Sequence, residues 1–487
     1  MAGICLFCNI VLYYIFKLYA TDISPQFLLH LHEYPLSAGH FFSMGGTMAN
    51  KIPENVISIL RTLESRGYEA YTVGGAVRDT LLGREPGDWD VTTSATPQEV
   101  MSLFSPHAIP TGLQHGTVTV GGGRGVEVTT FREDGDYTDH RRPDSVTFCR
   151  SLREDLARRD FTVNAIAMDV RGHIEDPFDG QGDLAAGILR AVGRPEKRFQ
   201  EDALRIMRGL RFASRLGFSI EPHTAAAMNA CAPLLREIAP ERLLVEMTGL
   251  LMGDAAGKIL REYPSILGEF LPEILPAVGL DQKNPYHIYT VWDHTAHAVD
   301  AAPKDPILRW TMLLHDLGKP ETFTVDEDDH GHFYGHHRAS ARIAGEITSR
   351  LRFDKRSRGE ILTLVDRHDA QLEPTSVVVR RNLAKYGEDT LRRLLDVKRA
   401  DTMAQAPRCF CRLEDLDRWE ALLDETLAAD ACFSLKDLAV KGGDLVALGF
   451  HGPKIGQLLQ TLLELVMEDT LPNDRETLLT YTKENLQ

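Results

Sequence analysis

The spacing of apolar residues changes once along this 487-residue chain, near residue 200, and that change constrains the fold more than any other feature. Before it, short apolar runs bounded by turn residues predict strands at 70–73, 88–92, 116–120, 126–131 and 165–169. After it, apolar residues recur three and four positions apart, which predicts helices over 204–216, 243–251, 391–397 and 455–467. So long a chain exceeds what one core supports. We therefore predict an α+β protein, with a small mixed-sheet unit followed by several helical units.

A glycine pair separates the first predicted strand from a predicted helix. Gly74 and Gly75 would let a triphosphate approach the backbone, and the helix that follows offers unpaired N–H groups to its oxygens. Arg78, one turn further on, is placed to hold a phosphate through its forked guanidinium. An ordinary strand-to-helix turn, with Arg78 and Asp79 as a solvated ion pair, is the alternative.

Two aspartates flank a tryptophan in the second predicted strand. A period of two puts Asp88 and Asp90 on one face, about 7 Å apart along the chain. With Glu127 from a neighbouring predicted strand they are candidate catalytic carboxylates, because hard oxygen ligands suit paired Mg²⁺ ions that activate a hydroxyl and neutralise a leaving pyrophosphate. An Asp-x-Asp pair alone is also common in surface turns and caps. The glycine turn upstream is what favours nucleotide transfer.

The segment 201–205 carries an acid and a base three residues apart. A helix would place Asp202 and Arg205 on one face, with Arg208 and Arg211 continuing near it. A carboxylate that accepts from an amino group, beside a guanidinium that donates to a ring nitrogen, would take both cytosine and adenine. Uracil and guanine present the reverse pattern and would lose these bonds. A solvated helix face with ion pairs is the alternative.

Together these motifs resemble those of the class II CCA-adding enzymes, the tRNA nucleotidyltransferases whose relatives include bacterial poly(A) polymerases. The glycine turn with Asp88-Trp89-Asp90 is similar to the family's metal and triphosphate motif, 158–165 to its ribose-binding motif, and 201–205 to its protein template. The resemblance implies a polymerase-beta-like nucleotidyltransferase head, Mg²⁺ as cofactor, and addition of CCA to the 3′ end of tRNA from CTP and ATP. It also implies these nucleotide-binding residues: Gly75, Arg78, Arg159, Asp202, Arg205, Arg208 and Arg211.

The segment 133–143 helps to distinguish full CCA addition from poly(A) synthesis and from C-only or A-only addition. Its polar residues and central glycine predict a mobile loop between strands. It is similar to the loop with which complete CCA enzymes switch from C to A addition, which favours full CCA synthesis over poly(A) polymerase or a C-only or A-only enzyme. A binding or regulatory protein that keeps the sheet without reacting, and an HD-type nucleotide phosphohydrolase, are the other classes. Intact Asp88 and Asp90 count against the first, and Asp202 with Arg205 against the second.

A second set of residues downstream resembles the ligands of HD phosphohydrolases, in which imidazoles and carboxylates from different helices converge on one or two metals. These residues are His294, His315, Asp316 and Asp401. His337 and His368 are candidates to complete a two-metal site. Imidazole ligands suit Ni, Mn, Fe or Zn, so the metal stays open. The hypothesis is hydrolysis of nucleotides or of a 2′,3′-cyclic tRNA end, with a vestigial structural role as the alternative.

Charge and cysteine content constrain the partners and the compartment. A formal net charge of −16 argues against a uniformly basic nucleic-acid wrapper, so RNA contacts must be local. The glycine-rich stretch 441–456 resembles the family's C-terminal region and is a candidate RNA phosphate contact, with a plain helix turn as an equal alternative. Seven thinly spread cysteines fit a reducing cytoplasm. The sequence implies no protein partner.

The first 47 residues differ from the rest. The apolar stretch 4–18 contains Lys17 and is shorter than the roughly 20 residues that span a bilayer, so no membrane association is expected. Helical patterning starts at Ile52, so we predict that Met48 is the true start and that 1–47 is a non-native or disordered extension, with a membrane anchor as the alternative. The remaining domains are predicted as a nucleotidyltransferase head (48–182), a helical neck that binds RNA or nucleotide (183–285), an HD metal-binding unit (286–405) and a helical tRNA-binding tail (406–487).

Overall fold

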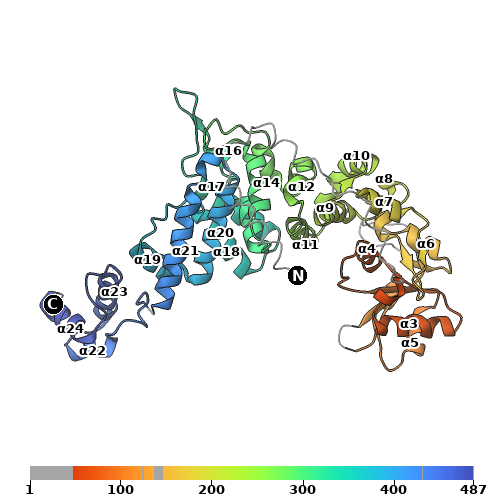
Figure 1. The fold of residues 1–487 in the computed structure, drawn as a ribbon, viewed down its shortest axis with the longest axis horizontal. Helices are drawn as coiled ribbons and strands as arrows, with labels where there is room; N and C mark the ends of the chain where they lie inside the picture. The colour runs from red at the N-terminus through yellow and green to blue at the C-terminus, as the bar shows by residue number, and fades with distance from the viewer. Residues whose placement is uncertain (1–47, 123–124, 136–145, 430, 486–487) are drawn as a thin grey trace, which may run out of the picture.

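The protein forms an arch in the computed structural model, which describes residues 48–122, 125–135, 146–429 and 431–485 (Figure 1). The head and the tail both bend to the same side of the central helices. The predicted extension 1–47 lies outside the described residues. Within the described ranges, no helix is both long enough and apolar enough to cross a membrane.

A seven-stranded mixed sheet forms the head, in the order β3-β4-β5-β2-β1-β8-β9. β2 and β5 run parallel, and the other neighbouring strands in this sheet are antiparallel. The strands are β1 (Ala70–Val73), β2 (Asp90–Thr93), β3 (Ala108–Gly112), β4 (Thr117–Val120), β5 (Val126–Thr130), β8 (Ala167–Met168) and β9 (Ile174–Glu175). The helices α3 (Glu54–Ser65) and α5 (Pro97–Leu103) pack against this sheet, and Val91 and Val128 are buried in their shared core. The predicted mixed sheet is confirmed.

The predicted strand at 88–92 begins two residues later than expected. Val73, the last residue of β1, is paired with Asp90, the first residue of β2. Beyond this pair β1 gives way to the glycine turn, so Asp88 has no neighbouring strand on that side with which to pair. Asp88 therefore lies just before the sheet, outside any helix or strand.

A separate two-stranded ladder flanks the predicted loop at 133–143. β6 (Arg132–Asp134) pairs antiparallel with β7 (Val146–Phe148). The strands confirm that the loop connects two strands, while residues 136–145 lie outside the described ranges.

Helices dominate the described chain after the head. The predicted helix 204–216 coincides with α9 (Leu204–Leu216), and the other three predicted segments lie within α11, α20 and α23. The neck contains α7 (Gly180–Ala186), α8 (Pro195–Glu201), α9, α10 (Pro222–Cys231), α11 (Pro240–Leu251), α12 (Ala256–Glu262) and α13 (Pro264–Leu267). The body contains α14 (Val291–Ala301), α15 (Pro306–Leu314), α16 (Lys319–Thr322), α17 (His336–Arg350), α18 (Lys355–Arg367), α19 (Ser376–Tyr386) and α20 (Glu388–Met403). α21 (Arg412–Ala428) leads to the tail helices α22 (Gly442–Ala447), α23 (Pro453–Met467) and α24 (Arg475–Asn485).

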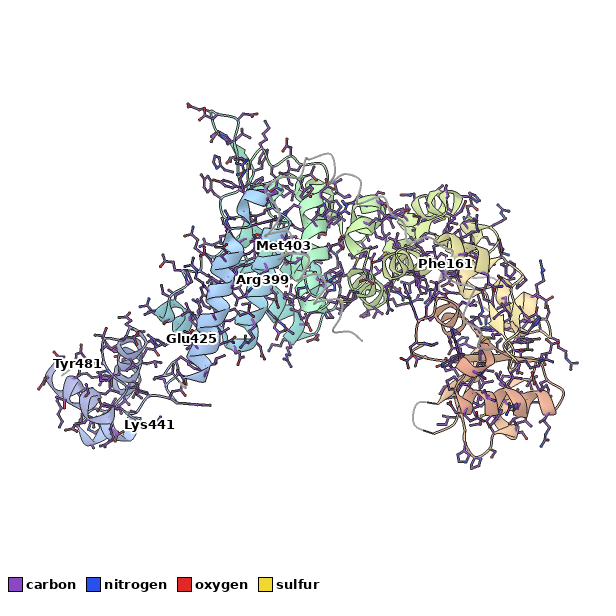
Figure 2. All side chains as sticks on the ribbon, in the orientation of Figure 1. Phe161, Arg399, Met403, Glu425, Lys441 and Tyr481 are labelled. Atoms are coloured by element: carbon purple, nitrogen blue, oxygen red, sulfur yellow. The ribbon has the colours of Figure 1, made fainter. Side chains whose placement is uncertain are left out.

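The buried apolar residues form several separate clusters of unequal size. One continuous apolar cluster runs from Ile52 in the head, through the neck, to Ala404 in the body. The tail packs around its own core, which includes Leu438 and Leu462. Figure 2 shows the tail, marked by Lys441 and Tyr481, at the opposite end of the arch from the head. Head, neck and body therefore share the largest core, smaller separate clusters lie in the head and among α19, α20 and α21, and the tail has a core of its own.

Candidate active site and second metal centre

Three carboxylates lie at one end of the two parallel strands of the head. Asp90 and Glu127 are directly opposite on β2 and β5, so both side chains leave the same face of the sheet. Asp88, two residues earlier, is exposed. Asp90 is also exposed, yet surrounding protein atoms remove part of its hydration, and together with the charge of Glu127 this raises the pKa of its carboxyl. Oxygen ligands with such mutual repulsion fit a bound divalent cation.

The glycine turn between β1 and α4 (Gly75–Leu81) approaches a guanidinium. Gly74 has φ of 74°, a conformation that favours glycine, and a Cβ there would lie 3.3 Å from Nη1 of Arg159. Nη2 of Arg159 donates to the buried Asp155 at 3.3 Å, which also accepts from the Thr92 hydroxyl on β2. Asp155 thus anchors Arg159 beside the turn, while Nε of Arg159 has no hydrogen-bond partner among the described residues.

A chain of hydrogen bonds links α4 to α9. Nη1 of Arg78 donates to Oδ1 of Asn164 at 2.7 Å, and Nδ2 of Asn164 donates to Asp160 at 3.1 Å. Asp160 also accepts from Nε of Arg208 at 2.8 Å. The glycine-turn motif and α9 therefore meet through Asp160 and Asn164 of the 158–165 motif, neither of which was singled out as a site residue.

Three of the predicted arginines surround one aromatic ring. The guanidinium carbons of Arg78, Arg208 and Arg211 lie 5.3, 5.3 and 4.4 Å from the centroid of Phe212. Arg211 is also held by Glu246, to which its Nε donates at 2.6 Å. Cation–π contacts and carboxylate partners thus fix guanidinium groups from two helices around this ring.

The pKa of Asp160 allows a test of whether the hydrogen-bonded chain from α4 to α9 stabilises the fold. Burial opposes its charge, but Arg208 and Asn164 outweigh burial and lower the pKa of Asp160 from its ordinary 3.8 to about 2. A lowered pKa stabilises the fold above about pH 4, and the contribution is lost as the pH falls from about 5 towards 2. Asp160→Asn is therefore expected to lower the free energy of unfolding by about 2 kcal/mol at pH 7 and by about half as much at pH 3. Urea unfolding at both pH values measures this. Glu64→Gln, at an exposed position, is the control, and an equal loss at both pH values would contradict the assignment.

Asp202 and Arg205 do not share a helical face, contrary to the prediction. Asp202 follows α8 with extended backbone, φ −137° and ψ 103°, and its Oδ1 accepts from the backbone N–H of Leu204 at the start of α9. A short carboxylate that binds a nearby N–H group competes with continuous helix, so the helix breaks here. Oδ2 of Asp202 accepts from Arg242 at 3.2 Å, and Arg205 donates to Glu201 at 2.8 Å. Arg242 had no signal in the sequence.

The predicted downstream ligands converge in the body. Nε2 of His294 lies 3.2 Å from Nε2 of His315 and 3.0 Å from Oδ1 of Asp401. Oδ2 of Asp316 lies 3.3 Å from Nε2 of His294 and 3.2 Å from Nε2 of His315. The helices α14, α15 and α20 thus bring four residues, separated by up to 107 positions, to a single point.

The outward nitrogens of these histidines are oriented by backbone carbonyls. Nδ1 of His294 lies 3.1 Å from the carbonyl oxygen of Ala404, and Nδ1 of His315 lies 2.7 Å from that of Met312. A carbonyl accepts only, so each Nδ1 carries the hydrogen and each Nε2 presents its lone pair inwards. Metal-binding imidazoles are held in this way. The donor set therefore fits a divalent metal.

His368 joins this pocket as predicted, but its neighbour is His336 rather than His337. Nε2 of His336 lies 3.1 Å from Nε2 of His368 and 3.4 Å from Oδ1 of Asp316. His337 lies within ligand distance of His336 and the exposed Asp369 instead. Two adjacent histidines at the start of α17 point in different directions, and their order alone did not say which faces inwards.

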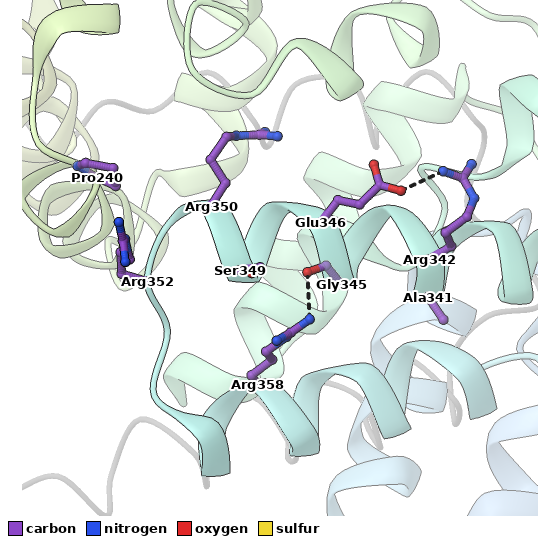
Figure 3. Close-up of a pocket in the computed structure, with 9 residues that line it drawn as sticks. All are labelled: Pro240, Ala341, Arg342, Gly345, Glu346, Ser349, Arg350, Arg352 and Arg358. Carbon is purple, nitrogen blue, oxygen red and sulfur yellow. Dashed lines mark hydrogen bonds and ion pairs between the residues drawn. The ribbon is translucent and has the colours of Figure 1, made fainter.

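An arginine-lined hollow between α11 and α17–α18 lies apart from both clusters (Figure 3). Arg342 pairs with Glu321 and Glu346, and Arg350 pairs with Glu273 in the neck. Nη2 of Arg358 donates to a carbonyl of α17. These guanidinium groups are used mainly to hold α17 and α18 to their neighbours.

Models of known families match four successive parts of the chain. They describe the poly A polymerase head domain at residues 70–190, the RNA- and SrmB-binding site of polymerase A at 217–275, the HD domain at 286–406 and domain 2 of tRNA nucleotidyltransferase at 361–482.

Some relatives are matched over nearly their whole length. The CCA-adding enzyme of Levilactobacillus brevis is 38% identical over 423 residues, which cover 86% of this chain and 95% of that enzyme. The chain belongs to the CCA-adding enzyme family. A second family member, from Geobacillus thermodenitrificans, is 50% identical over 275 residues, which span 55% of this chain and 64% of that enzyme. The solved Bacillus stearothermophilus CCA-adding enzyme in complex with CTP has a TM-score of 0.66 and 34% identity, with 89% of this chain and 98% of that chain covered.

Membership of the CCA-adding enzyme family indicates that divalent metal ions are used both in the head and in the body. The nucleotidyltransferase head and the HD domain both imply the use of divalent metal ions. The groups His294–His315–Asp401 and Asp316–His336–His368, in which every residue but the partly buried Asp401 is buried, have ligand geometry. The carboxylates of β2 and β5 supply the matching candidates in the head.

Proposed function

We propose that this protein adds CCA to the 3′ end of tRNA, using CTP and ATP, in tRNA maturation and repair. The observation that carries the proposal is the meeting of three separate motifs in the head and neck: the carboxylates of β2 and β5, the arginines beside the glycine turn, and the arginines of α9. The similarity to proteins known as CCA-adding enzymes, one of them solved with bound CTP, supports the same activity.

The catalytic role falls to the three carboxylates. Asp88, Asp90 and Glu127 would hold Mg²⁺, which supplies charge neutralisation at the α-phosphate and favours ionisation of the attacking 3′-hydroxyl. The new bond forms between that oxygen and the α-phosphorus, and pyrophosphate leaves with the bridging oxygen. Gly75 leaves space for the triphosphate, and Arg78 and Arg159 supply positive charge beside it.

Base selection is assigned to the junction of α8 and α9. Arg242 donates to Oδ2 of Asp202 and so orients this carboxylate, which would accept from the amino group of cytosine or adenine. Arg205, three residues on, would donate to the ring nitrogen, and Arg208 and Arg211 would contact the rest of the nucleotide. Uracil and guanine would place an acceptor against Asp202, which accounts for their rejection.

The domain division follows from the same assignment. We propose residues 48–182 as the nucleotidyltransferase head, 183–285 as the RNA- and nucleotide-binding neck, 286–405 as the HD unit and 406–487 as the tRNA-binding tail. The cytoplasm is the proposed compartment. The described cysteines 149, 231, 409, 411 and 432 are free thiols, as a reducing compartment allows, while the C-x-x-C pair 5 and 8 lies outside the described residues.

Incubation of the protein with tRNA lacking its 3′ end tests the function. With Mg²⁺ and each labelled nucleotide in turn, we expect C to be added first, A only after C, and U or G poorly. Long A-tracts on unrelated RNA would show poly(A) polymerase instead, and addition that stops after C would show a partial enzyme.

Hydrolysis of a nucleoside phosphate by the HD pocket is the second candidate function. The exposed ring of Tyr334 is stacked on His332 at the pocket, with centroids 5.3 Å apart and planes 7° from parallel, as suits an aromatic base. Gly331 fixes this hairpin, because a Cβ there would lie 2.1 Å from the carbonyl oxygen of Gln282. Nζ of Lys319 at the same pocket is a candidate phosphate contact. A free nucleotide and a 2′,3′-cyclic RNA end share this chemistry. Ni, Mn, Fe and Zn all remain suited to the imidazole ligands.

A further inference from the structure

The hollow between α11 and α17–α18 contains positive charge that no close carboxylate balances. Its volume is about 940 Å³, and of the four arginines that line it, Arg342 and Arg350 are held in the ion pairs described above. Nε of Arg352 lies 3.9 Å from Oε1 of Glu241, and both side chains are exposed, so that water weakens this contact. Arg352 is therefore available to an anionic ligand.

Arg358, the fourth arginine of the hollow, has unused hydrogen-bond donors. Its Nη2 donates to the carbonyl oxygen of Gly345 at 3.1 Å, which is the single hydrogen bond of this guanidinium among the described residues. Its Nε is buried and has no partner in the described part of the chain. A guanidinium carries five N–H donors and a permanent charge. The charge of Arg358 thus faces a neutral carbonyl, and an anion in the hollow would stabilise it.

The backbone at Arg352 is in a conformation that an arginine rarely adopts. Arg352 follows the last turn of α17 with φ of 63°, where glycine is the usual residue. Strain of this kind is concentrated at ligand sites. Figure 3 shows the side chain beside Pro240, at the start of α11. The choice of arginine at this position therefore indicates a use for its charge at the seam between neck and body.

The lining favours a nucleic-acid backbone over a protein surface. Apart from the arginines, it consists of small or polar residues: Pro240, Ala341, Gly345, Glu346 and Ser349. The centres of protein interfaces are rich in large apolar and aromatic side chains, and this lining has none. Arginine and serine are common phosphate contacts, and Ser349 is exposed. The hollow is also much larger than one small anion, so successive phosphates of a strand fit it better.

The hollow lies close to the base-selecting junction. Pro240 lines it, and Arg242, two residues further along α11, donates to Asp202. In Figure 1, α11 and α18 lie at the lower edge of the central helices, on the side towards which the head and the tail bend. An RNA whose 3′ end reaches the junction of head and neck would therefore pass the hollow.

We propose that this hollow binds backbone phosphates of the RNA whose 3′ end is extended, with Arg352 and Arg358 as the charged contacts and Ser349 as a neutral donor. The inference rests on the proposed CCA addition and adds to it a contact between neck and body that reads no base. Arginines that replace counterions on phosphates make binding weaken as salt rises. The contact therefore contributes to affinity for RNA and to its salt dependence, not to the choice of nucleotide.

RNA binding in the absence of nucleotides tests the hollow. The full-length protein is titrated into fluorescent tRNA lacking CCA at several KCl concentrations, and anisotropy gives Kd. Arg352→Gly suits the local backbone, and Arg358→Gln keeps an amide donor, so the double variant should fold. We expect its Kd to rise about tenfold or more, and the slope of log Kd against log KCl concentration to fall by about 2, roughly one for each lost phosphate contact.

Two further variants separate the hollow from total charge. Arg352→Lys keeps a positive charge and is expected to retain the slope. Arg171→Ala removes an exposed arginine from the head and should leave both Kd and slope unchanged. In CMP transfer, the double variant should show a higher KM for tRNA, with the KM for CTP and the kcat at saturating tRNA unchanged, a separation that general unfolding does not produce.

The outcomes distinguish this inference from the proposed function. Unchanged Kd and slope in the double variant would overturn the RNA contact and leave the hollow to an acidic protein partner. An equal loss of binding in Arg171→Ala would also overturn it, because total charge would then explain the effect. If the wild type binds tRNA in this salt-dependent way and the double variant does not, but neither adds CMP, the hollow is upheld and CCA addition is rejected.

Discussion

Replacing both aspartates before and at the start of β2, as Asp88→Asn with Asp90→Asn, is expected to reduce CCA addition by more than about 1,000-fold. Asparagine keeps the shape of each side chain but removes the negative charge that would hold Mg²⁺. Loss of metal-assisted charge stabilisation is worth several kcal/mol, and each 1.36 kcal/mol is about tenfold in rate. Initial rates of labelled CMP transfer to tRNA lacking CCA, at saturating Mg²⁺, give the measurement.

A matched variant separates metal binding from general loss of charge. Glu54→Gln with Glu64→Gln removes two carboxylate charges from exposed positions on α3 of the same head and is expected to leave the rate within about twofold. The circular dichroism spectrum should be unchanged in both double variants, since neither changes buried packing. Extension of tRNA at the wild-type rate by the Asp88→Asn, Asp90→Asn variant would remove the basis of the proposed function.

The preference for C over U is expected to fall by about 100-fold in Asp202→Asn. A carboxylate can only accept, whereas an asparagine amide can turn its NH₂ group towards the carbonyl oxygen of uracil. The variant therefore both weakens the bond to cytosine and removes the acceptor–acceptor clash with uracil, and hydrogen bonds to charged groups are worth about 1.5–3 kcal/mol each. The ratio of kcat/KM for CTP to that for UTP, measured on the same tRNA, reports the change.

Asparagine at position 202 still has an oxygen to accept from the backbone N–H of Leu204, so the start of α9 should be retained. Asp254→Asn, an exposed aspartate in the neck, serves as the control and should keep the wild-type ratio. A general loss of rate without a change in the ratio would assign Asp202 a structural role only.

Sequence periodicity predicted the helices better than the strands. α9 has a strongly one-sided set of buried residues, including Met207 and Leu210, so its bounds followed from spacing alone. β3 was not predicted, because it is an edge strand with exposed side chains and contains Pro110, which suppresses the usual strand pattern. Short strands such as β9 gain their pairing from the sheet rather than from their own residues.

The candidate site residues also differ in how well the sequence predicted them. Strand alternation and the neighbouring acidic pair predicted that Glu127 lies on a strand beside Asp90, and the strand register confirms that position. Asp155 and Arg242 act through partners distant in the sequence, Thr92 and Asp202, and no local pattern marks them. The interruption between α8 and α9 at Asp202 was not predicted. Helical spacing assumes that the helix continues, and it does not reveal a carboxylate that instead binds a backbone N–H group at the start of the next helix.

The register between β2 and β5 limits which insertions and deletions this protein can accept during evolution. Glu127 accompanies Asp90 only because the two parallel strands are aligned at that position. Sliding β5 by one residue would turn Glu127 into the apolar layer beneath α3 and α5, which would remove the proposed oxygen ligand and bury an uncompensated charge. If these carboxylates carry the reaction as proposed, insertions and deletions within β2 or β5 are expected to abolish catalysis, whereas changes at the turn joining β4 to β5 can leave the alignment intact.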